Sequence, residues 1–173
     1  MKEQTHKIIV LAGFMGTGKT TVGKELAGKL NLEFVDLDSV IERREGKKIS
    51  KIFEEDGETY FRQLEKQVVK DCSEGGPRVL ATGGGAIIDP ENLEALKSNG
   101  VVILLEADTE TIIKRTKDDT YRPLLLVQDP KKRIEELLES RRSFYNKADY
   151  KIDTSAMGVN EVVNQILGIL ADE

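Results

Sequence analysis

Short runs of β-branched and other apolar residues alternate along the chain with longer stretches in which apolar positions recur about every 3.6 residues. The short runs cover residues 8–12, 33–36, 79–81, 101–105 and 150–152. Runs of this length are typical of strands buried in a parallel sheet, and the periodic stretches between them are typical of crossover helices. The pattern therefore predicts an α/β fold.

The periodic stretches give the expected helices. They lie over residues 19–30, around Val40 and Ile41, from Ser50 through Val68, after Pro90, after Pro130, and around Ile166 and Leu170. We expect Ser50 to cap the third helix and Gly57 to interrupt it. Residues 116–129 fit neither period, and a connection of this length inside a domain is usually functional or mobile.

Composition narrows the class of protein. The 173 residues, 39% hydrophobic and 33% charged, fit one globular domain spanning residues 1–173 and exclude a disordered, fibrous or membrane protein. A net charge of −5 provides no general attraction to nucleic acid or to an anionic membrane. One cysteine and one histidine exclude a disulfide scaffold and a zinc site, and the N-terminus does not resemble a signal peptide. A cytoplasmic location is expected.

Residues 13–20, GFMGTGKT, match the phosphate-binding pattern G-x-x-x-x-G-K-[ST] between a predicted strand and a predicted helix. Glycines let successive backbone N–H groups turn toward a phosphate, and the helix start adds its positive dipole end. Lys19 would place a cation on the outer phosphates, and Thr20 could ligate Mg²⁺. A glycine-rich turn that binds nothing is the alternative, but the complete motif in this context is rarely accidental.

Two carboxylates and a glycine run follow the next strands. If the second strand continues past its apolar part, Asp36 and Asp38 share one face and could serve a metal's water shell and a substrate hydroxyl. The alternative is a strand end followed by an aspartate that caps the next helix. Three glycines, residues 83–85 after Thr82, would let a ligand touch the backbone, although a plain loop is the alternative.

Several arginines are candidates for binding an anion, each with an ordinary alternative. Arg62 could pair with Glu65 at i,i+3, and taken alone this favours a solvated ion pair on a helix surface. Arg122, followed by proline in the irregular segment, could be presented toward a ligand or could be a solvated loop charge. Arg141 and Arg142 lie late in a helix, where a cation also suits the helix dipole.

Together these motifs resemble the shikimate kinase family over nearly the whole chain. The resemblance rests on GFMGTGKT at residues 13–20, DLD at 36–38, FRxxE at 61–65, TGGG at 82–85, RPLL at 122–125, and RxxxYxxA at Arg141, Tyr145 and Ala148. It implies a three-layer P-loop kinase, similar to the nucleoside monophosphate kinases, with a five-stranded parallel sheet flanked by helices. It also implies a substrate-binding region at about residues 38–72 and a lid at about 116–129.

The resemblance implies transfer of the ATP γ-phosphate to the 3-hydroxyl of shikimate, with Mg²⁺, in aromatic amino acid biosynthesis. Asp38 would act as base, with Lys19 and Arg122 as further catalytic residues. The ATP-binding residues would be Gly16, Thr17, Gly18, Lys19, Thr20, Thr21 and Arg122. The shikimate-binding residues would be Asp38, Arg62, Gly84 and Arg141. Thr20 would ligate the metal and Asp36 would act through water, while Arg115 would lie near the adenine.

The chain departs from the family pattern after Arg141, where a proline and a glutamate are missing, and Arg142 stands next to it. Spacing from Tyr145 favours Arg141 as the residue that faces the substrate. Two other functions stay open at this point: a P-loop kinase for another small metabolite such as gluconate, and a non-catalytic nucleotide-binding homologue. A monomer is expected, with no nucleic-acid or membrane partner.

Overall fold

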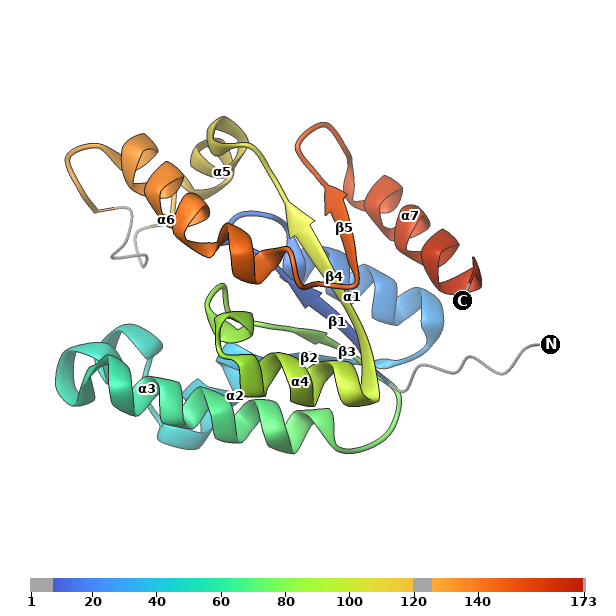
Figure 1. Ribbon diagram of the computed structural model, residues 1–173, viewed down its shortest axis with the longest axis horizontal. Helices are drawn as coiled ribbons and strands as arrows, with labels where there is room; N and C mark the ends of the chain where they lie inside the picture. Colours follow the sequence, from blue (N-terminus) through green and yellow to red (C-terminus); the bar gives the residue numbers. More distant parts are fainter. Residues whose placement is uncertain (1–7, 120–125, 173) are drawn as a thin grey trace.

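The computed structural model describes residues 8–119 and 126–172 and has a central sheet of five strands (Figure 1). In chain order the elements are β1 (Ile8–Ala12), α1 (Lys19–Leu30), β2 (Glu33–Asp36), α2 (Leu37–Glu45), α3 (Ile49–Ser73), β3 (Arg78–Ala81), the 3-10 helix η1 (Ala86–Ile88), α4 (Pro90–Asn99), β4 (Gly100–Glu106), α5 (Thr109–Thr116), α6 (Pro130–Tyr145), β5 (Tyr150–Asp153) and α7 (Val159–Asp172). The predicted strands are confirmed, each within a residue of its predicted bounds.

The strands lie in the order β2-β3-β1-β4-β5, and each neighbouring pair is parallel. After β1 the chain forms β2 at one edge of the sheet, returns to place β3 between β2 and β1, and then crosses to the other side of β1 at β4. In open parallel sheets, ligands bind at the carboxyl ends of the strands where the order reverses. The loops after β1, β2 and β3 all leave the sheet at that edge.

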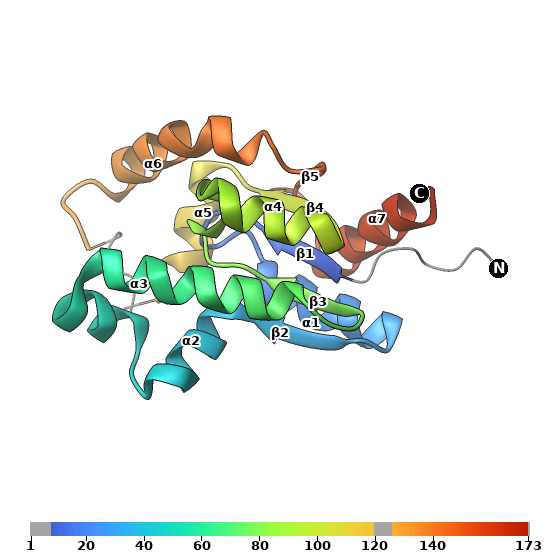
Figure 2. The same cartoon turned by 60° about the horizontal axis from the view of Figure 1, so that its bottom comes forward.

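Alternate side chains of β1 enter two separate hydrophobic cores. Ile8 and Val10 pack in the core under α2, α3, α4 and α6, whereas Ile9 and Leu11 pack in the core under α1 and α7. Helices α3 and α4 lie side by side over the first face (Figure 2). Because both faces of the sheet are covered, the inner strands β3, β1 and β4 are apolar and buried along most of their length, whereas the edge strands β2 and β5 carry charged residues. This arrangement confirms the three-layer α/β architecture.

The start of α3 differs from the prediction. The helix begins at Ile49, so Ser50 lies inside it and is not its N-cap. The carboxylate of Glu42, on α2, instead accepts a hydrogen bond from the Ile49 N–H at 3.1 Å, and so caps the helix from a neighbouring element. The predicted interruption is confirmed, because Gly57 has φ 85° and ψ 169°.

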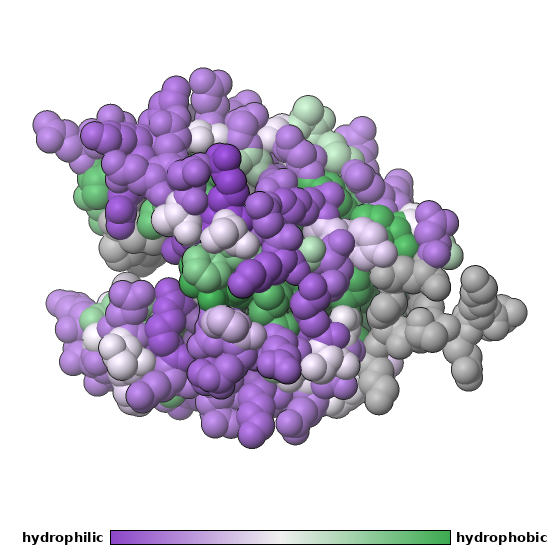
Figure 3. Space-filling view, viewed as in Figure 1, coloured by the Kyte–Doolittle hydropathy of each residue, from purple (hydrophilic) through white to green (hydrophobic). Residues whose placement is uncertain are grey.

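The predicted lid, residues 116–129, starts at the last residue of α5 and ends just before α6. Its central part, residues 120–125 with Arg122, lies outside the described residues. Figure 3 shows that the surface is indented between α3 and α6. No helix within residues 8–119 or 126–172 has the length and apolar character needed to cross a membrane.

Candidate active site

The chain passes from β1 into α1 through the predicted phosphate-binding turn. Gly16 has φ 76° and Gly18 has φ 97°, backbone conformations that side-chain-bearing residues rarely adopt. The Thr17 hydroxyl donates to the Phe14 carbonyl at 2.8 Å and braces the turn from inside. Gly18 is the N-cap of α1 and has no side chain to cap it, so the first N–H groups of the helix can serve a ligand.

Lys19 and Thr20 begin α1 at the mouth of this turn. The Lys19 ammonium donates to the carbonyls of Gly13 at 2.7 Å and Phe14 at 2.8 Å, so its side chain folds back along the loop. The Thr20 hydroxyl donates to Asp36 Oδ2 at 3.1 Å. A hydroxyl and a carboxylate side by side fit Mg²⁺, which binds hard oxygen atoms and usually takes only one or two of its ligands from the protein.

Asp36 and Asp38 do not share a strand face as predicted, because β2 ends at Asp36 and α2 begins at Leu37. Asp36 is the N-cap of α2, and its Oδ1 accepts from the Ser39 N–H at 3.1 Å. The capping alternative is therefore correct for Asp36. Its other oxygen faces Thr20, whereas Asp38 lies in the first turn of α2 and faces the glycine run that follows β3.

The glycine run lies directly against three of the predicted functional side chains. A Cβ atom placed on each glycine would meet a different side chain. The Cβ on Gly83 would lie 2.8 Å from Asp38 Oδ1, the Cβ on Gly84 would lie 3.2 Å from Arg141 Nη1, and the Cβ on Gly85 would lie 2.8 Å from both Arg62 guanidinium Nη atoms. The run thus brings together residues from α2, α3 and α6, and the absence of side chains on it is what lets them approach.

If Asp38 is the base that the family resemblance implies, Gly83→Ala should lower kcat by about tenfold or more, because the new methyl group would displace it and small misplacements of a reacting group are costly. Gly76→Ala is the matched control, since a Cβ there would meet no described heavy atom within 4 Å. Steady-state kinetics of both variants, with ATP affinity measured by calorimetry, checks this. Equal activity of the two variants would contradict the proposed closeness of Gly83 and Asp38.

Burial is the main cause that raises the pKa of Asp38 to about 6, and the nearby carboxylates of Asp36 and Glu65 raise it further. The Lys19 ammonium acts in the opposite direction. A carboxylate with a pKa near 6 is still mostly ionised at neutral pH and is a better proton acceptor than an ordinary aspartate.

This raised pKa has a consequence for stability. Between about pH 4 and pH 6 the folded protein holds a proton on Asp38 that the unfolded chain releases, so stability should fall as pH rises through this window. Asp38→Asn cannot ionise and should therefore become the more stable protein above pH 6. Denaturant unfolding of both proteins at several pH values tests this, and a stability difference that does not vary with pH would contradict it.

Arg62 and Glu65 form an ion pair that is not the solvated one expected from the residues alone. Their side chains meet at 2.7 Å, and only 3% of the Glu65 side chain is exposed, against 37% for Arg62. Burial raises the pKa of Glu65, while the charge of Arg62 opposes that rise. The buried Glu65 carboxylate therefore holds the guanidinium of Arg62 in place beside Gly85.

Of the two adjacent arginines on α6, Arg141 faces the glycine run. Its guanidinium lies 5.3 Å from the centre of the Phe14 ring and close to Gly84. Arg142 instead pairs with Glu139 at 2.6 Å, and 70% of its side chain is exposed. The geometry therefore places Arg141, not Arg142, with Asp38 and Arg62.

Arg115 links α5 to the phosphate-binding turn. It donates to the Gly16 carbonyl at 3.2 Å and to the hydroxyl and carbonyl of Thr154 at 3.0 and 2.8 Å. The Thr154 hydroxyl lies within hydrogen-bonding distance of two carbonyl acceptors, that of Glu106 at 3.0 Å and that of Thr17 at 3.1 Å. No motif pointed to Thr154 as a support of this turn, and neither Phe14 nor the hydroxyl of Tyr145 was predicted to contact site residues.

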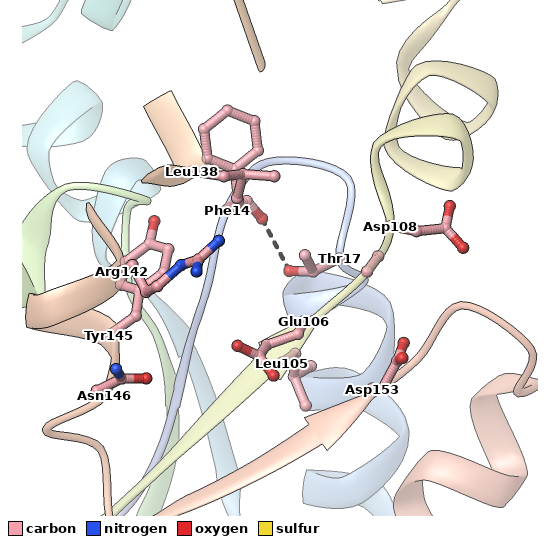
Figure 4. Close-up of a pocket in the computed structure, with 11 residues that line it drawn as sticks. Phe14, Thr17, Leu105, Glu106, Asp108, Leu138, Arg142, Tyr145, Asn146 and Asp153 are labelled. Carbon is pink, nitrogen blue, oxygen red and sulfur yellow. Dashed lines mark hydrogen bonds between the residues drawn. The ribbon is translucent and has the colours of Figure 1, made fainter. Parts of the chain in front are cut away.

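A cavity of about 300 Å³ lies between the phosphate-binding turn and α6 (Figure 4). Phe14 and Thr17 line it from the turn, and Arg142 and Tyr145 line it from α6. Asp38, Arg62 and Arg141 are not part of this lining. The cavity is therefore separate from the cluster around the glycine run, although the two share the Phe14 and Tyr145 side chains as a wall.

The sheet order, the phosphate-binding turn and the cluster beside it define a P-loop kinase. The family model for shikimate kinase matches residues 15–171. The chain belongs to the shikimate kinase family, so the resemblance seen in its motifs is confirmed.

Known proteins agree with this assignment. The chain is 49% identical to the shikimate kinase of Caldanaerobacter subterraneus subsp. tengcongensis over 161 residues, which cover 93% of this chain and 94% of the relative. The structure of shikimate kinase from Acinetobacter baumannii in complex with shikimate matches with a TM-score of 0.93 at 40% identity, covering 98% and 95% of the two chains. A gluconokinase from Sinorhizobium meliloti matches with a TM-score of 0.63 at 16% identity, over 98% and 94% of the two chains, and shares only the fold.

Proposed function

We propose that this chain transfers the γ-phosphate of ATP to the 3-hydroxyl of shikimate, giving shikimate 3-phosphate and ADP. The observation that carries the proposal is the glycine run, which gathers Asp38, Arg62 and Arg141 at the edge of the sheet where the P-loop lies. A cyclic acid with several hydroxyl groups needs cations for its carboxylate and an acceptor for a hydroxyl. The cluster supplies both.

At the nucleotide end, the backbone of the turn and the start of α1 would hold the ATP phosphates. The residues in this role are Gly16, Thr17, Gly18, Lys19, Thr20 and Thr21, with Arg122 reaching in from the lid. Thr20 would ligate Mg²⁺, and Asp36 would hold one of the metal's water ligands. Bound there, the metal would neutralise charge on the outer phosphates.

At the acceptor end, Arg62 and Arg141 would bind the shikimate carboxylate. A planar guanidinium offers two parallel N–H donors to the two oxygens of a carboxylate, and the arrangement fixes direction as well as charge. Glu65 and the Phe14 ring keep the two guanidinium groups in place before substrate arrives. Gly84 would present its backbone to the substrate.

The chemistry then depends on Asp38. Its carboxylate would accept a hydrogen bond from the 3-hydroxyl, aim the oxygen at the γ-phosphorus for in-line attack, and take the proton as the new bond forms. Phosphoryl transfer usually has a loose transition state, so orientation and charge stabilisation by Lys19 and Arg122 contribute more than early deprotonation. The expectations of a monomer, of a cytoplasmic location and of no nucleic-acid or membrane partner stay predictions.

An acceptor panel separates shikimate from other small acids. We expect MgATP to support ADP formation with shikimate at a kcat/KM at least about 100-fold above that with gluconate, because polar sites reject acceptors that leave their groups unpaired. Higher activity with gluconate would favour a different metabolite kinase. If no acceptor in the panel supports ADP formation, a non-catalytic homologue would be favoured.

A further inference from the structure

We propose that the hydroxyl group of Tyr145 is a positioning group for this reaction, acting through the Gly84 backbone and through Arg141. This inference rests on the proposed function, because it concerns how the acceptor end of that site is held. Tyr145 is the last residue of α6, one turn after Arg141, and only 5% of it is exposed.

The Tyr145 hydroxyl joins two parts of the acceptor site. It donates a hydrogen bond to the Gly84 carbonyl at 2.6 Å, between residues 61 positions apart in the chain. The same oxygen accepts a longer hydrogen bond from Arg141 Nη1 at 3.5 Å. One hydroxyl group therefore contacts both the glycine run and the arginine beside it.

The hydrogen bond to Gly84 fixes the direction of a peptide plane. In a planar trans peptide the carbonyl and the following N–H point in opposite directions, so holding the Gly84 carbonyl toward Tyr145 directs the Gly85 N–H away from it. Three consecutive glycines have unusual backbone freedom and no side chains to anchor them. Backbone hydrogen bonds from the Ala86 and Ile88 N–H groups, each at 3.2 Å, hold the Gly83 and Gly85 carbonyls, whereas the Gly84 carbonyl is held by the Tyr145 side chain.

Arg141 is confined on three sides by the same group of residues. The Phe14 ring lies 5.3 Å from its guanidinium carbon, Gly84 lies in front of it, and the Tyr145 hydroxyl lies at its edge. The Phe14 carbonyl oxygen also accepts a hydrogen bond from the Lys19 ammonium at 2.8 Å. The contacts of Tyr145 and Phe14 thus connect the arginine at the acceptor end with the lysine at the nucleotide end.

Packing alone does not explain a tyrosine here. Phenylalanine would fill the same space with the same ring, so packing accounts for the ring and not for the hydroxyl. The hydrogen bond to Gly84 compensates the burial of that hydroxyl. Burial also raises the pKa of Tyr145, so the hydroxyl keeps its proton and remains a donor at neutral pH.

Tyr145→Phe tests the proposal, because it removes the oxygen and preserves the ring. We expect kcat/KM for shikimate to fall about 3- to 10-fold, the loss typical of one neutral hydrogen bond, mainly through a higher KM for shikimate. The KM for ATP should not change, since the phosphate-binding turn keeps its own bracing. Tyr60→Phe is the matched control, as its hydroxyl bonds to Glu45 on the surface at 3.0 Å.

The melting temperature of each variant is measured first, and all proteins are assayed at one temperature at which every variant is folded. A loss of activity then does not reflect unfolding. Unchanged kcat/KM for shikimate in Tyr145→Phe would overturn the positioning role, as would a parallel loss of affinity for shikimate and ATP, which indicates general loosening. Failure of the unsubstituted enzyme to use shikimate would instead overturn the proposed function. The two failures are therefore distinguishable.

Discussion

Asp38→Asn should reduce kcat by about 10²- to 10⁴-fold, the range typical of removing a general base, while ATP affinity stays near that of the unsubstituted enzyme. Asparagine keeps the shape of aspartate and can still contact a hydroxyl, but it cannot take the proton or carry the charge that orients it. Asp38 lies against Gly83, whereas Asp36 is the carboxylate that contacts Thr20 in the phosphate-binding turn. Single-turnover kinetics together with calorimetric titration of ATP measures both effects.

Asp36→Asn is the informative comparison. Asp36 contacts Thr20 and caps α2, so its substitution should weaken the use of MgATP and lower stability as well as activity. A split between the two variants, with Asp38 affecting turnover and Asp36 affecting nucleotide use, is the expected pattern. Turnover of Asp38→Asn within a few-fold of the unsubstituted enzyme would remove Asp38 from the role of base.

Arg141→Ala should lower kcat/KM for shikimate by about 2–4 kcal/mol in transition-state free energy, which is roughly 30- to 1,000-fold. Removing one arginine of the pair would leave the substrate carboxylate only partly neutralised beside the Phe14 ring. The loss should appear mainly in KM for shikimate. Steady-state kinetics with each substrate varied in turn gives the required constants.

Arg142→Ala is the matched control on the next residue of the same helix. Its charge pairs with Glu139 on the surface, and exposed pairs contribute little, so this variant should keep nearly full activity. If Arg142→Ala lost activity and Arg141→Ala did not, the assignment of the substrate-facing arginine would be wrong by one position.

Local sequence was sufficient for the strands, most helices and the phosphate-binding turn. Each depends on residues close in the chain: β-branched runs make the strands, and the glycines at 16 and 18 fit the left-handed backbone of the turn. The preference for Arg141 over Arg142 came from a local spacing, their distance from Tyr145; the structure places Arg141 beside Gly84, and its contact with a substrate stays a prediction. The family resemblance added the roles, which no short-range pattern determines.

Other features depend on contacts between distant segments. The start of α3 is capped by Glu42 of another helix, which is why Ser50 was wrongly expected to cap it. The burial of Glu65 depends on elements that pack over it, so the i,i+3 spacing with Arg62 alone indicated a surface pair.

The meaning of the three glycines likewise needed the fold. The sequence predicted that a ligand can approach the glycine run. It did not predict that Asp38, Arg62 and Arg141 each lie against one of these glycines. The hydrogen bond from Tyr145 to Gly84 joins two parts of the acceptor site, and no local sequence pattern predicts it.

In the proposed reaction Asp38 aims the 3-hydroxyl of shikimate at the γ-phosphate held by the P-loop. NMR identification of the product formed from shikimate and MgATP, with ADP measured in the same sample, tests this reaction. We expect one phosphate ester, at the 3-oxygen, for each ADP released. Phosphorylation at another hydroxyl, or ADP release that is the same with and without shikimate, would contradict the account.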